Sequence, residues 1–239
     1  MVSITLRGMV AGLLGGALLI GGGSLLHAAP TAPTSPSTTP TAIYRTNLIR
    51  NSGGDDSTGS ADGSVVAVPS WTVLLGQFTV VRYGSGKTFP AVFGTSSAEH
   101  GSNFFAGGNG FDTAEAYQEI NVSAAAADID AGRVRYTLSG YFGGSLGQQD
   151  SAYAYLSFKD ATSALGLSPN LGGVSAEERG GQSALLPRSR SGAVPPGTRA
   201  IQVYLVMQRR SGGYNDGYAD SLSLTLSVPT TVYLPAVQR

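Results

Sequence analysis

The segment SLSLTLSV at positions 221–228 decides the fold, because leucine or valine occupies every second position in it. Serine or threonine fills the positions between. A strand with this period of two buries one face and leaves the other face in water. The segment AIQVYLVMQ at 200–208 alternates in the same way, with Ile201, Val203, Leu205 and Met207 on one face. Both segments are therefore expected to be strands of antiparallel sheets.

The same pattern extends along most of the chain. Further strands are expected at 70–75, 78–83, 118–122, 133–142 and 152–158. Glycine, asparagine and aspartate separate these stretches, and no long segment has the 3.6-residue period of a helix. The short run of alanines at 124–127 is expected to lie in a loop, and 161–197 is expected to be irregular. The pattern predicts an all-β fold, either an antiparallel sandwich or a barrel.

Composition excludes several classes of function. Lysine plus arginine and aspartate plus glutamate number 15 each among 239 residues, so the basic excess that nucleic-acid binding requires is missing. The chain has no cysteine, which excludes disulfides, thiol catalysis, iron–sulfur clusters and zinc ribbons. An exported protein without cysteine is more typical of bacteria or archaea than of small animal secreted domains.

The first 29 residues have the pattern of a signal peptide. Arg7 provides the positive start, an uncharged apolar run follows at 8–26, and Ala28 and Ala29 are small. The apolar run is also about as long as a membrane span, so an uncleaved N-terminal anchor is the alternative. Either interpretation places the rest of the chain outside the cell, secreted or attached to the surface, with no other membrane segment.

Three further parts follow the export segment. The stretch PTAPTSPSTTPTA at 30–42 is rich in threonine, proline and serine and is expected to be an extended linker. A single β-sandwich domain is expected at 43–228. The tail at 229–239 contains Pro229 and Pro235, which exclude a helix, so it is expected to be an edge strand or a sorting or assembly tag.

Motifs that would indicate an enzyme are incomplete. The segment GGSLG at 143–147 matches the serine hydrolase pattern, but that pattern needs a later histidine, and His100 precedes it. The segment GSGKT at 84–88 lacks the first glycine of a phosphate loop, and Pro90 interrupts the helix that should follow. The segment DIDAG at 128–132 is only part of a calcium loop. All three are expected to be turns, and no catalytic residue is predicted.

Carboxylates and amides gather near both ends of the domain. The segment NSGGDD at 51–56 follows a short apolar stretch, and NDGYAD at 215–220 is expected to be a loop before the last strand. First and last strands of a sandwich are often neighbours. Two oxygen-rich loops brought together in this way suit a hard cation such as Ca²⁺. The alternative is a pair of turns stabilised by Asn and Asp side chains without a metal.

Several segments in chain order resemble those of galactose-binding-like jelly-roll domains, a group that includes many carbohydrate-binding modules. The segments are NLIRNSGGD at 47–55, Trp71, FFAGG at 104–108 with AYQEI at 116–120, DAG at 130–132 with YTLSG at 136–140, and DSLSL at 220–224. The likeness covers about 46–227. It implies an antiparallel β-sandwich of the jelly-roll type and a domain that binds carbohydrate without catalysis.

The resemblance also implies a structural calcium ion. Its ligands would be Asp55 and Asp220, together with backbone carbonyls near Asn51. This chain departs from the family pattern, since Ser52 replaces a proline and Asp55 replaces a longer glutamate. The shorter reach of an aspartate leaves Asp56 as an alternative ligand.

Sugar binding needs exposed aromatic faces with polar groups beside them. We expect Tyr141, Tyr153 and Tyr155 to bind ligand, and Tyr153 and Tyr155 share one face of their strand. Further aromatic candidates are Phe142, Tyr214 and Tyr218, of which the last two are expected to pack against the second carboxylate segment. The predicted function is a carbohydrate-binding module, and the alternative is an adhesive surface protein that associates with copies of itself.

Overall fold

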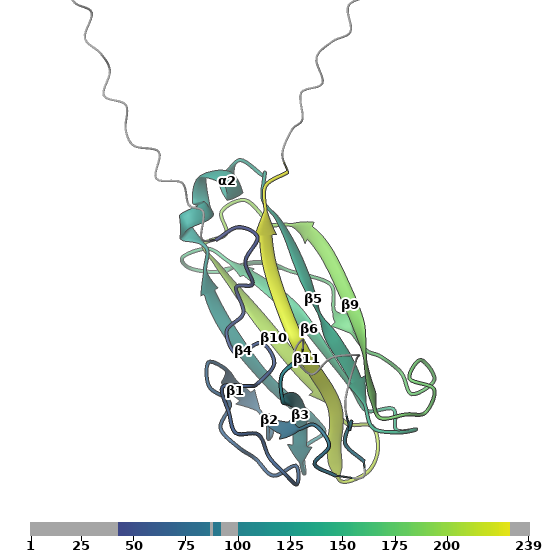
Figure 1. Cartoon of the computed structure of the whole chain (residues 1–239). Helices are drawn as coiled ribbons and strands as arrows, with labels where there is room; N and C mark the ends of the chain where they lie inside the picture. The colour runs from purple at the N-terminus through teal and green to yellow at the C-terminus, as the bar shows by residue number, and fades with distance from the viewer. Residues whose placement is uncertain (1–42, 87, 92–99, 230–239) are drawn as a thin grey trace, which may run out of the picture. The chain divides into compact units, whose positions relative to one another are not determined.

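The computed structural model describes residues 43–86, 88–91 and 100–229, and Figure 1 shows the long strands running side by side. The strands form two antiparallel sheets. One sheet has the order β1 (Thr72–Leu75), β4 (Thr113–Asn121), β10 (Ala200–Gln208), β6 (Ser151–Lys159) and β7 (Ala164–Leu167), with β8 (Leu171–Gly172) also paired to β6. The other has the order β2 (Thr79–Arg82), β3 (Asn103–Asn109), β11 (Tyr214–Ser227), β5 (Arg135–Gly144) and β9 (Ala184–Ala193).

The chain crosses between the two sheets at most of its connections. It changes sheet from β3 to β4, β5 and β6 in turn, and again from β8 to β9, β10 and β11. This alternation of sheets between antiparallel strands is the connectivity of a jelly roll. The predicted all-β antiparallel sandwich is therefore confirmed, and the barrel is excluded.

The core lies between the sheets and contains the residues that the alternation predicts. Leu222, Leu224 and Leu226 of β11 are fully buried, as are the four large side chains on the inner face of β10. Trp71, Phe78 and Phe105 form an aromatic group in the same core, with ring centroids 5.4 to 5.8 Å apart. The indole N–H of Trp71 donates to the carbonyl of Asn51, so the polar atom of this ring has a partner.

A second apolar cluster lies on the other side of the five-stranded sheet. On β3, Phe105 faces the core, whereas its neighbours Phe104 and Ala106 belong to this outer cluster together with Val81, Leu185 and Tyr218. Half-buried side chains pack around it, namely Tyr83, Phe89, Tyr141 and Tyr214. Near β2 and β3, these side chains therefore shield the outer face of the five-stranded sheet from solvent.

The last strand begins earlier than predicted. The segment 215–220, expected to be a loop, belongs to β11, which runs from Tyr214 to Ser227. Its backbone pairs with β3 and β5, and the register shifts between Asn215 and Tyr218 and again between Asp220 and Ser223. These bulges accommodate turn-forming residues inside a strand, and the prediction of a loop was wrong.

Two other expectations of the secondary structure were wrong. The stretch 161–197 contains β7, β8 and the ten-residue β9, which lies at the edge of its sheet, where Pro187 is tolerated. The alanines at 124–127 fall in a short 3-10 helix, η1 (Ser123–Ala125), and in α2 (Ala126–Asp130). Strand β9 was not predicted because charged and small residues obscure the alternation of its sequence.

The N-terminal part of the domain runs beside the last strand, as expected. Tyr44 forms a parallel bridge with Leu226, and the amide of Leu48 donates to the carbonyl of Leu224. The expected signal peptide or anchor at 1–29, the linker at 30–42 and tail residues 230–239 lie outside the described residues. Within the part of the chain that the structure describes, no helix is long and apolar enough to cross a membrane.

Candidate functional site

Asp55 and Asp220, which we call the carboxylate pair, meet beside Gly53. A Cβ atom placed on Gly53 would lie 2.9 Å from Oδ2 of Asp55 and 2.9 Å from Oδ1 of Asp220. The same position lies 3.8 Å from the carbonyl oxygen of His100. The space that glycine leaves here is thus surrounded by oxygen atoms from three parts of the chain.

Backbone and tyrosine donors hold both carboxylates in place. Oδ1 of Asp55 accepts from the amides of Ser102 and Asn103, at 2.7 and 3.1 Å. Oδ2 of Asp220 accepts from the hydroxyl of Tyr83 at 2.6 Å, and its Oδ1 accepts from the amide of Ser221 at 2.5 Å. One oxygen of each residue, Oδ2 of Asp55 and Oδ1 of Asp220, faces Gly53.

The position of Asp220 is electrostatically unfavourable for its charge. The side chain is fully buried, and burial raises the pKa of Asp220 to about 8, with Asp55 adding to the rise. The hydrogen bonds from Tyr83 and Ser221 act in the opposite direction on this pKa. A buried carboxylate beside a second one is stabilised in its charged form by a cation.

Asn51 and Asp56, the other two predicted metal ligands, are placed differently. The side chain of Asn51 accepts from the amide of Asp56 and donates to the carbonyl of Pro69. Its backbone carbonyl accepts from Trp71. Asp56 is exposed to solvent. The structure therefore brings Asp55 and Asp220 together, whereas Asn51 holds the turn at 51–56 in which Asp55 lies.

Tyr141 lies next to the carboxylate pair, directly across from Asp220 in the pairing of β5 with β11. Its ring meets the edge of the His100 ring at 5.1 Å between centroids. Nδ1 of His100 lies 3.2 Å from Oγ of Ser221. Two hollows adjoin at Ser221: one of about 410 Å³ beside the carboxylate pair, and one of about 350 Å³ beside Tyr141 and Ser189.

Tyr153 and Tyr155 lie on the opposite sheet from Tyr141. Both point to the outer side of β6, because Ala152, Ala154 and Leu156 fill the core side. This wet face also carries Tyr204 of β10 and Tyr117 of β4. Three rings form a row across adjacent strands, which we call the tyrosine row: Tyr117, Tyr204 and Tyr155.

The rings of the tyrosine row are ordered by one another. Tyr155 and Tyr204 stack with centroids 4.7 Å apart and 1° between their planes. Tyr204 and Tyr117 stack at 5.5 Å and 23°. Tyr153 stands one row further along β6, across from Val206. The result is a half-buried aromatic strip on the outer face of the six-stranded sheet.

Carboxylates and amides border this strip. The hydroxyl of Tyr155 donates to Glu115 at 3.1 Å, and the hydroxyl of Tyr204 donates to Gln202 at 2.8 Å. The side-chain amide of Gln202 in turn donates to Glu119 at 2.8 Å. Sequence reasoning missed Tyr204 and Glu115. The alternation of their strands signals the outward direction, but only the register between strands places them beside Tyr155.

The remaining aromatic candidates serve packing. Phe142 and Tyr218 are fully buried, and Tyr214 packs edge-on against Phe89 at 5.7 Å. The hydroxyl of Tyr218 donates to Asp216. Tyr214 and Tyr218 thus pack beside the carboxylate segment 215–220, as expected. Phe142 belongs to the core and cannot stack on a sugar.

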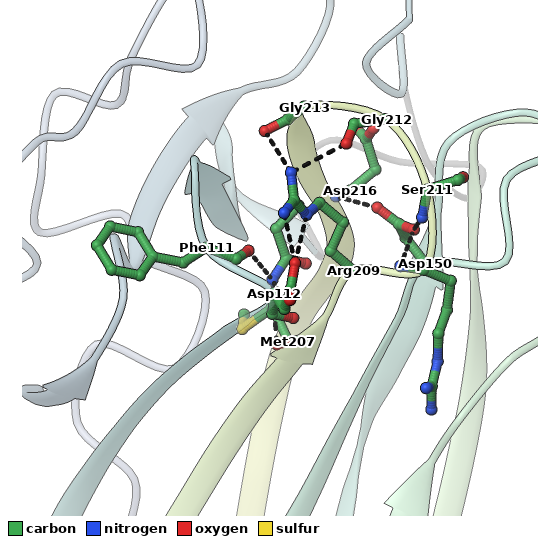
Figure 2. A network of polar contacts seen from close by, with 11 residues as sticks. Phe111, Asp112, Asp150, Met207, Arg209, Ser211, Gly212, Gly213 and Asp216 are labelled. Carbon is green, nitrogen blue, oxygen red and sulfur yellow. Dashed lines mark hydrogen bonds and ion pairs between the residues drawn. The ribbon is translucent and has the colours of Figure 1, made fainter.

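A polar network closes the end of the sandwich near Asp216. Figure 2 shows the carboxylate of Asp150 between the turn that contains Ser211 and the backbone of Asp216. Asp150 accepts from the amides of Arg210, Ser211 and Asp216 at 2.6, 3.1 and 2.9 Å. All these contacts fix backbone, so the network has a structural role.

Comparison with known proteins gives structural likenesses only. No protein-family model matches the sequence, and no curated protein matches it. The enzymatically active domain of tailspike protein 4 of bacteriophage CBA120 matches with a TM-score of 0.42 and 15% identity, over 76% of this chain and 21% of that chain. This chain thus spans about a fifth of the tailspike domain.

Carbohydrate-binding modules also match. The module TmCBM61, solved with β-1,4-galactotriose, has a TM-score of 0.41 and 12% identity over 77% of this chain and 99% of the module. The CBM22-1 xylan-binding domain of Paenibacillus barcinonensis Xyn10C has a TM-score of 0.39 and 11% identity over 72% of this chain and 94% of the domain. Both are carbohydrate-binding modules, as are many members of the group that the sequence resembles.

Proposed function

We propose that this domain is an exported carbohydrate-binding module that is not an enzyme. The observation that carries the proposal is the tyrosine row on the outer face of the six-stranded sheet. Tyrosine rings offer apolar surface to the C–H groups of a sugar, and their hydroxyls, with Glu115 and Gln202, offer hydrogen bonds to its hydroxyls.

The tyrosine row is also suited to binding because it is already ordered. Stacking and hydrogen bonds hold Tyr155 and Tyr204 in one conformation. A binding site whose side chains are fixed before the ligand arrives loses less conformational entropy when it binds. On this face Lys159 pairs with Glu119 and Glu115 accepts from the hydroxyl of Tyr155, and the ligand that we propose is a neutral sugar chain.

A calcium ion held by the carboxylate pair is the second part of the proposal. Oxygen atoms of Asp55, Asp220 and the His100 carbonyl surround the space beside Gly53, and Ca²⁺ prefers oxygen ligands. Within the described residues, no three acidic, histidine or cysteine side chains gather as a metal site. Carbonyls would therefore complete the set, and the ion would tie the start of the domain to its last strand.

The surroundings of Ser221 and His100 do not suit a catalytic serine. A serine nucleophile needs free N–H groups beside it to stabilise the oxyanion of the intermediate. The amide of Ser221 donates to Asp220, and the amide of Leu222 donates to the carbonyl of Ser52. The backbone N–H groups of Ser221 and Leu222 are therefore already hydrogen-bonded and are not free to stabilise an oxyanion.

Self-association is the second candidate function, and β1 favours it. This strand lies at the edge of the six-stranded sheet, and Val73, Leu74 and Leu75 are about half exposed, at 47%, 52% and 48%. Exposed apolar edge strands pair readily with other chains. An adhesive protein would sediment as an oligomer in the absence of sugar and would show no retention by polysaccharides.

Native affinity electrophoresis tests the proposal. The purified domain, residues 43–239, is run in gels that contain xylan, β-1,4-galactan, galactomannan or hydroxyethylcellulose. At least one polysaccharide should retard it, and the double variant Tyr155→Ala/Tyr204→Ala should be retarded less. If no gel retards the wild type while sedimentation shows oligomers, self-association replaces carbohydrate binding as the function.

A further inference from the structure

We infer that the domain has a second carbohydrate-binding face, on the five-stranded sheet, and that it can therefore hold two glycan chains at once. The inference rests on the proposed function and extends it from binding to cross-linking. Its starting point is Tyr141, which the fold separates from Tyr153 and Tyr155 by the thickness of the sandwich.

Side-chain hydroxyls cover the outer face of β9, β5 and β11 in two rows. The first row is Ser189, Ser139 and Ser223, and the second is Ser191, Thr137 and Thr225, as the strand register places them. We call these six residues the hydroxyl face. The hydroxyls of Thr137 and Ser191 hydrogen-bond to each other at 2.7 Å, so each orients the other on this face.

Hydroxyl groups suit a neutral sugar, because each can donate and accept a hydrogen bond, as sugar hydroxyls do. The charged neighbours of this face are Arg188, which is paired with Glu178, and Arg135, which is exposed one row beyond Thr137 on β5. Hydroxyl groups therefore make up most of the face. A polyhydroxylated chain is the occupant that this chemistry fits.

The hollow beside Tyr141 adds the aromatic element. It measures about 350 Å³ and is lined by Tyr141, Pro187 and the serines 139, 189 and 221. This volume is near the lower end of that of small-molecule sites, roughly 300 Å³. Tyr141 is positioned by the ring of His100 at 5.1 Å, and His100 contacts Ser221. The hollow thus combines one fixed ring with several hydroxyls.

The geometry of the fold makes the two faces independent. Tyr141 and the hydroxyl face point away from the core on one sheet, and the tyrosine row points away from it on the other. Packed sheets lie about 10 Å apart, with the core between them. One glycan segment cannot contact both faces, so simultaneous occupation joins two chains or two distant parts of one chain.

The test uses four versions of the domain in the same polysaccharide gels. They are the wild type, Tyr155→Ala/Tyr204→Ala, Ser189→Arg, and the three changes combined. Ser189 is exposed and lines the hollow, so an arginine there fills the hollow without disturbing the core. Tyr141→Ala is a second variant for the same face, with its melting temperature checked, and Ser211→Arg in an exposed turn is the matched control.

Two sites should give a graded result. Each single-face variant should keep part of the retardation, with an apparent Kd weakened by about tenfold through the loss of avidity, and the combined variant should lose it. Only the wild type and the Ser211→Arg control should make a solution of the retarding polysaccharide turbid or more viscous.

The possible failures can be told apart. If Tyr155→Ala/Tyr204→Ala abolishes retardation while Ser189→Arg and Tyr141→Ala match the wild type, the module has one face and this inference is wrong, although the proposed function stands. If no polysaccharide retards the wild type, the proposed function fails and the second face fails with it.

Discussion

The rings of Tyr155 and Tyr204 are parallel to within 1°, with centroids 4.7 Å apart, although 49 positions separate the two residues along the chain. Their strands β6 and β10 pair in register, which brings the rings opposite each other. Tyr204 also stacks on Tyr117, so it is the central ring of the row. The aromatic strip therefore depends on this residue more than on either neighbour.

Replacement of Tyr204 should show how much of the binding the strip provides. Tyr204→Ala removes the central ring and the support of both neighbours, so the Kd for the polysaccharide that retards the wild type should rise by about tenfold or more, equivalent to about 1.4 kcal/mol. Tyr204→Phe keeps the stack and loses only the bond to Gln202, so its Kd should change less. Isothermal titration measures both. Equal Kd values for Ala and wild type would remove the tyrosine row from the binding site.

Gly53→Ala tests the calcium site without changing any charge. The added Cβ would lie 2.9 Å from an oxygen of each member of the carboxylate pair, in the space where the ion is proposed to bind. The wild type should melt at a higher temperature with millimolar calcium than with chelator, since calcium at 100 times its Kd adds about 2.7 kcal/mol. In Gly53→Ala this calcium-dependent difference should disappear.

Gly147→Ala is the matched control, because an added Cβ there would meet no atom within 4 Å. It should keep the full calcium-dependent rise in melting temperature. Comparing each variant with and without calcium cancels any strain that the new methyl group causes in the metal-free protein. A calcium effect that survives in Gly53→Ala would place the ion elsewhere or refute it.

The pKa of Asp220 predicts how the metal-free domain responds to pH. The folded state keeps the proton on Asp220 up to about pH 8, whereas the unfolded chain loses it near the usual value of about 4. Between these limits the unfolded state binds fewer protons, so the free energy of unfolding should fall as pH rises. Urea unfolding in chelator at pH 5 and pH 8 measures the difference.

Two comparisons check that Asp220 causes this dependence. Asp220→Asn carries no titratable group and should flatten the fall between pH 5 and pH 8. Calcium binds the ionised carboxylate, so its stabilising effect on the wild type should grow over the same range. An equally steep fall in Asp220→Asn would assign the pH dependence to other groups.

Much of the fold could be predicted from the sequence because alternation depends on local residue order. Segments such as 200–208 and 221–228 have one face of large apolar side chains, and that is enough to identify a half-buried strand. The edge strand β9 was not predicted, because its sequence, ALLPRSRSGA, has proline and arginine at positions that only an edge strand tolerates. The start of β11 was not predicted, because Asn, Asp and Gly usually form turns. Pairing with two neighbouring strands overrides that preference.

The candidate sites depend on register, which local patterns do not contain. The proximity of Asp55 to Asp220 followed from the resemblance and from the usual pairing of first and last strands, so it could be anticipated. The grouping of Tyr155 with Tyr204, and the separation of Tyr155 from Tyr141, depend on which sheet each strand joins. The sequence shows that each of these tyrosines lies on an alternating strand, but not which residues lie beside it.

The stability of the sandwich should depend strongly on Asp150, a fully buried carboxylate that accepts from three backbone amides. Asp150→Ala leaves these N–H groups without their acceptor and should lower the free energy of unfolding by about 3 kcal/mol. Asp112→Asn is the comparison, because the side chain of Asp112 is 82% exposed in its ion pair with Arg209, and loss of such a pair costs about 1 kcal/mol or less. Urea unfolding measures both. Similar values for the two variants would mean that the contacts of Asp150 in Figure 2 are no stronger than the surface ion pair of Asp112 with Arg209. The turn at 209–213 would then be held by its own backbone.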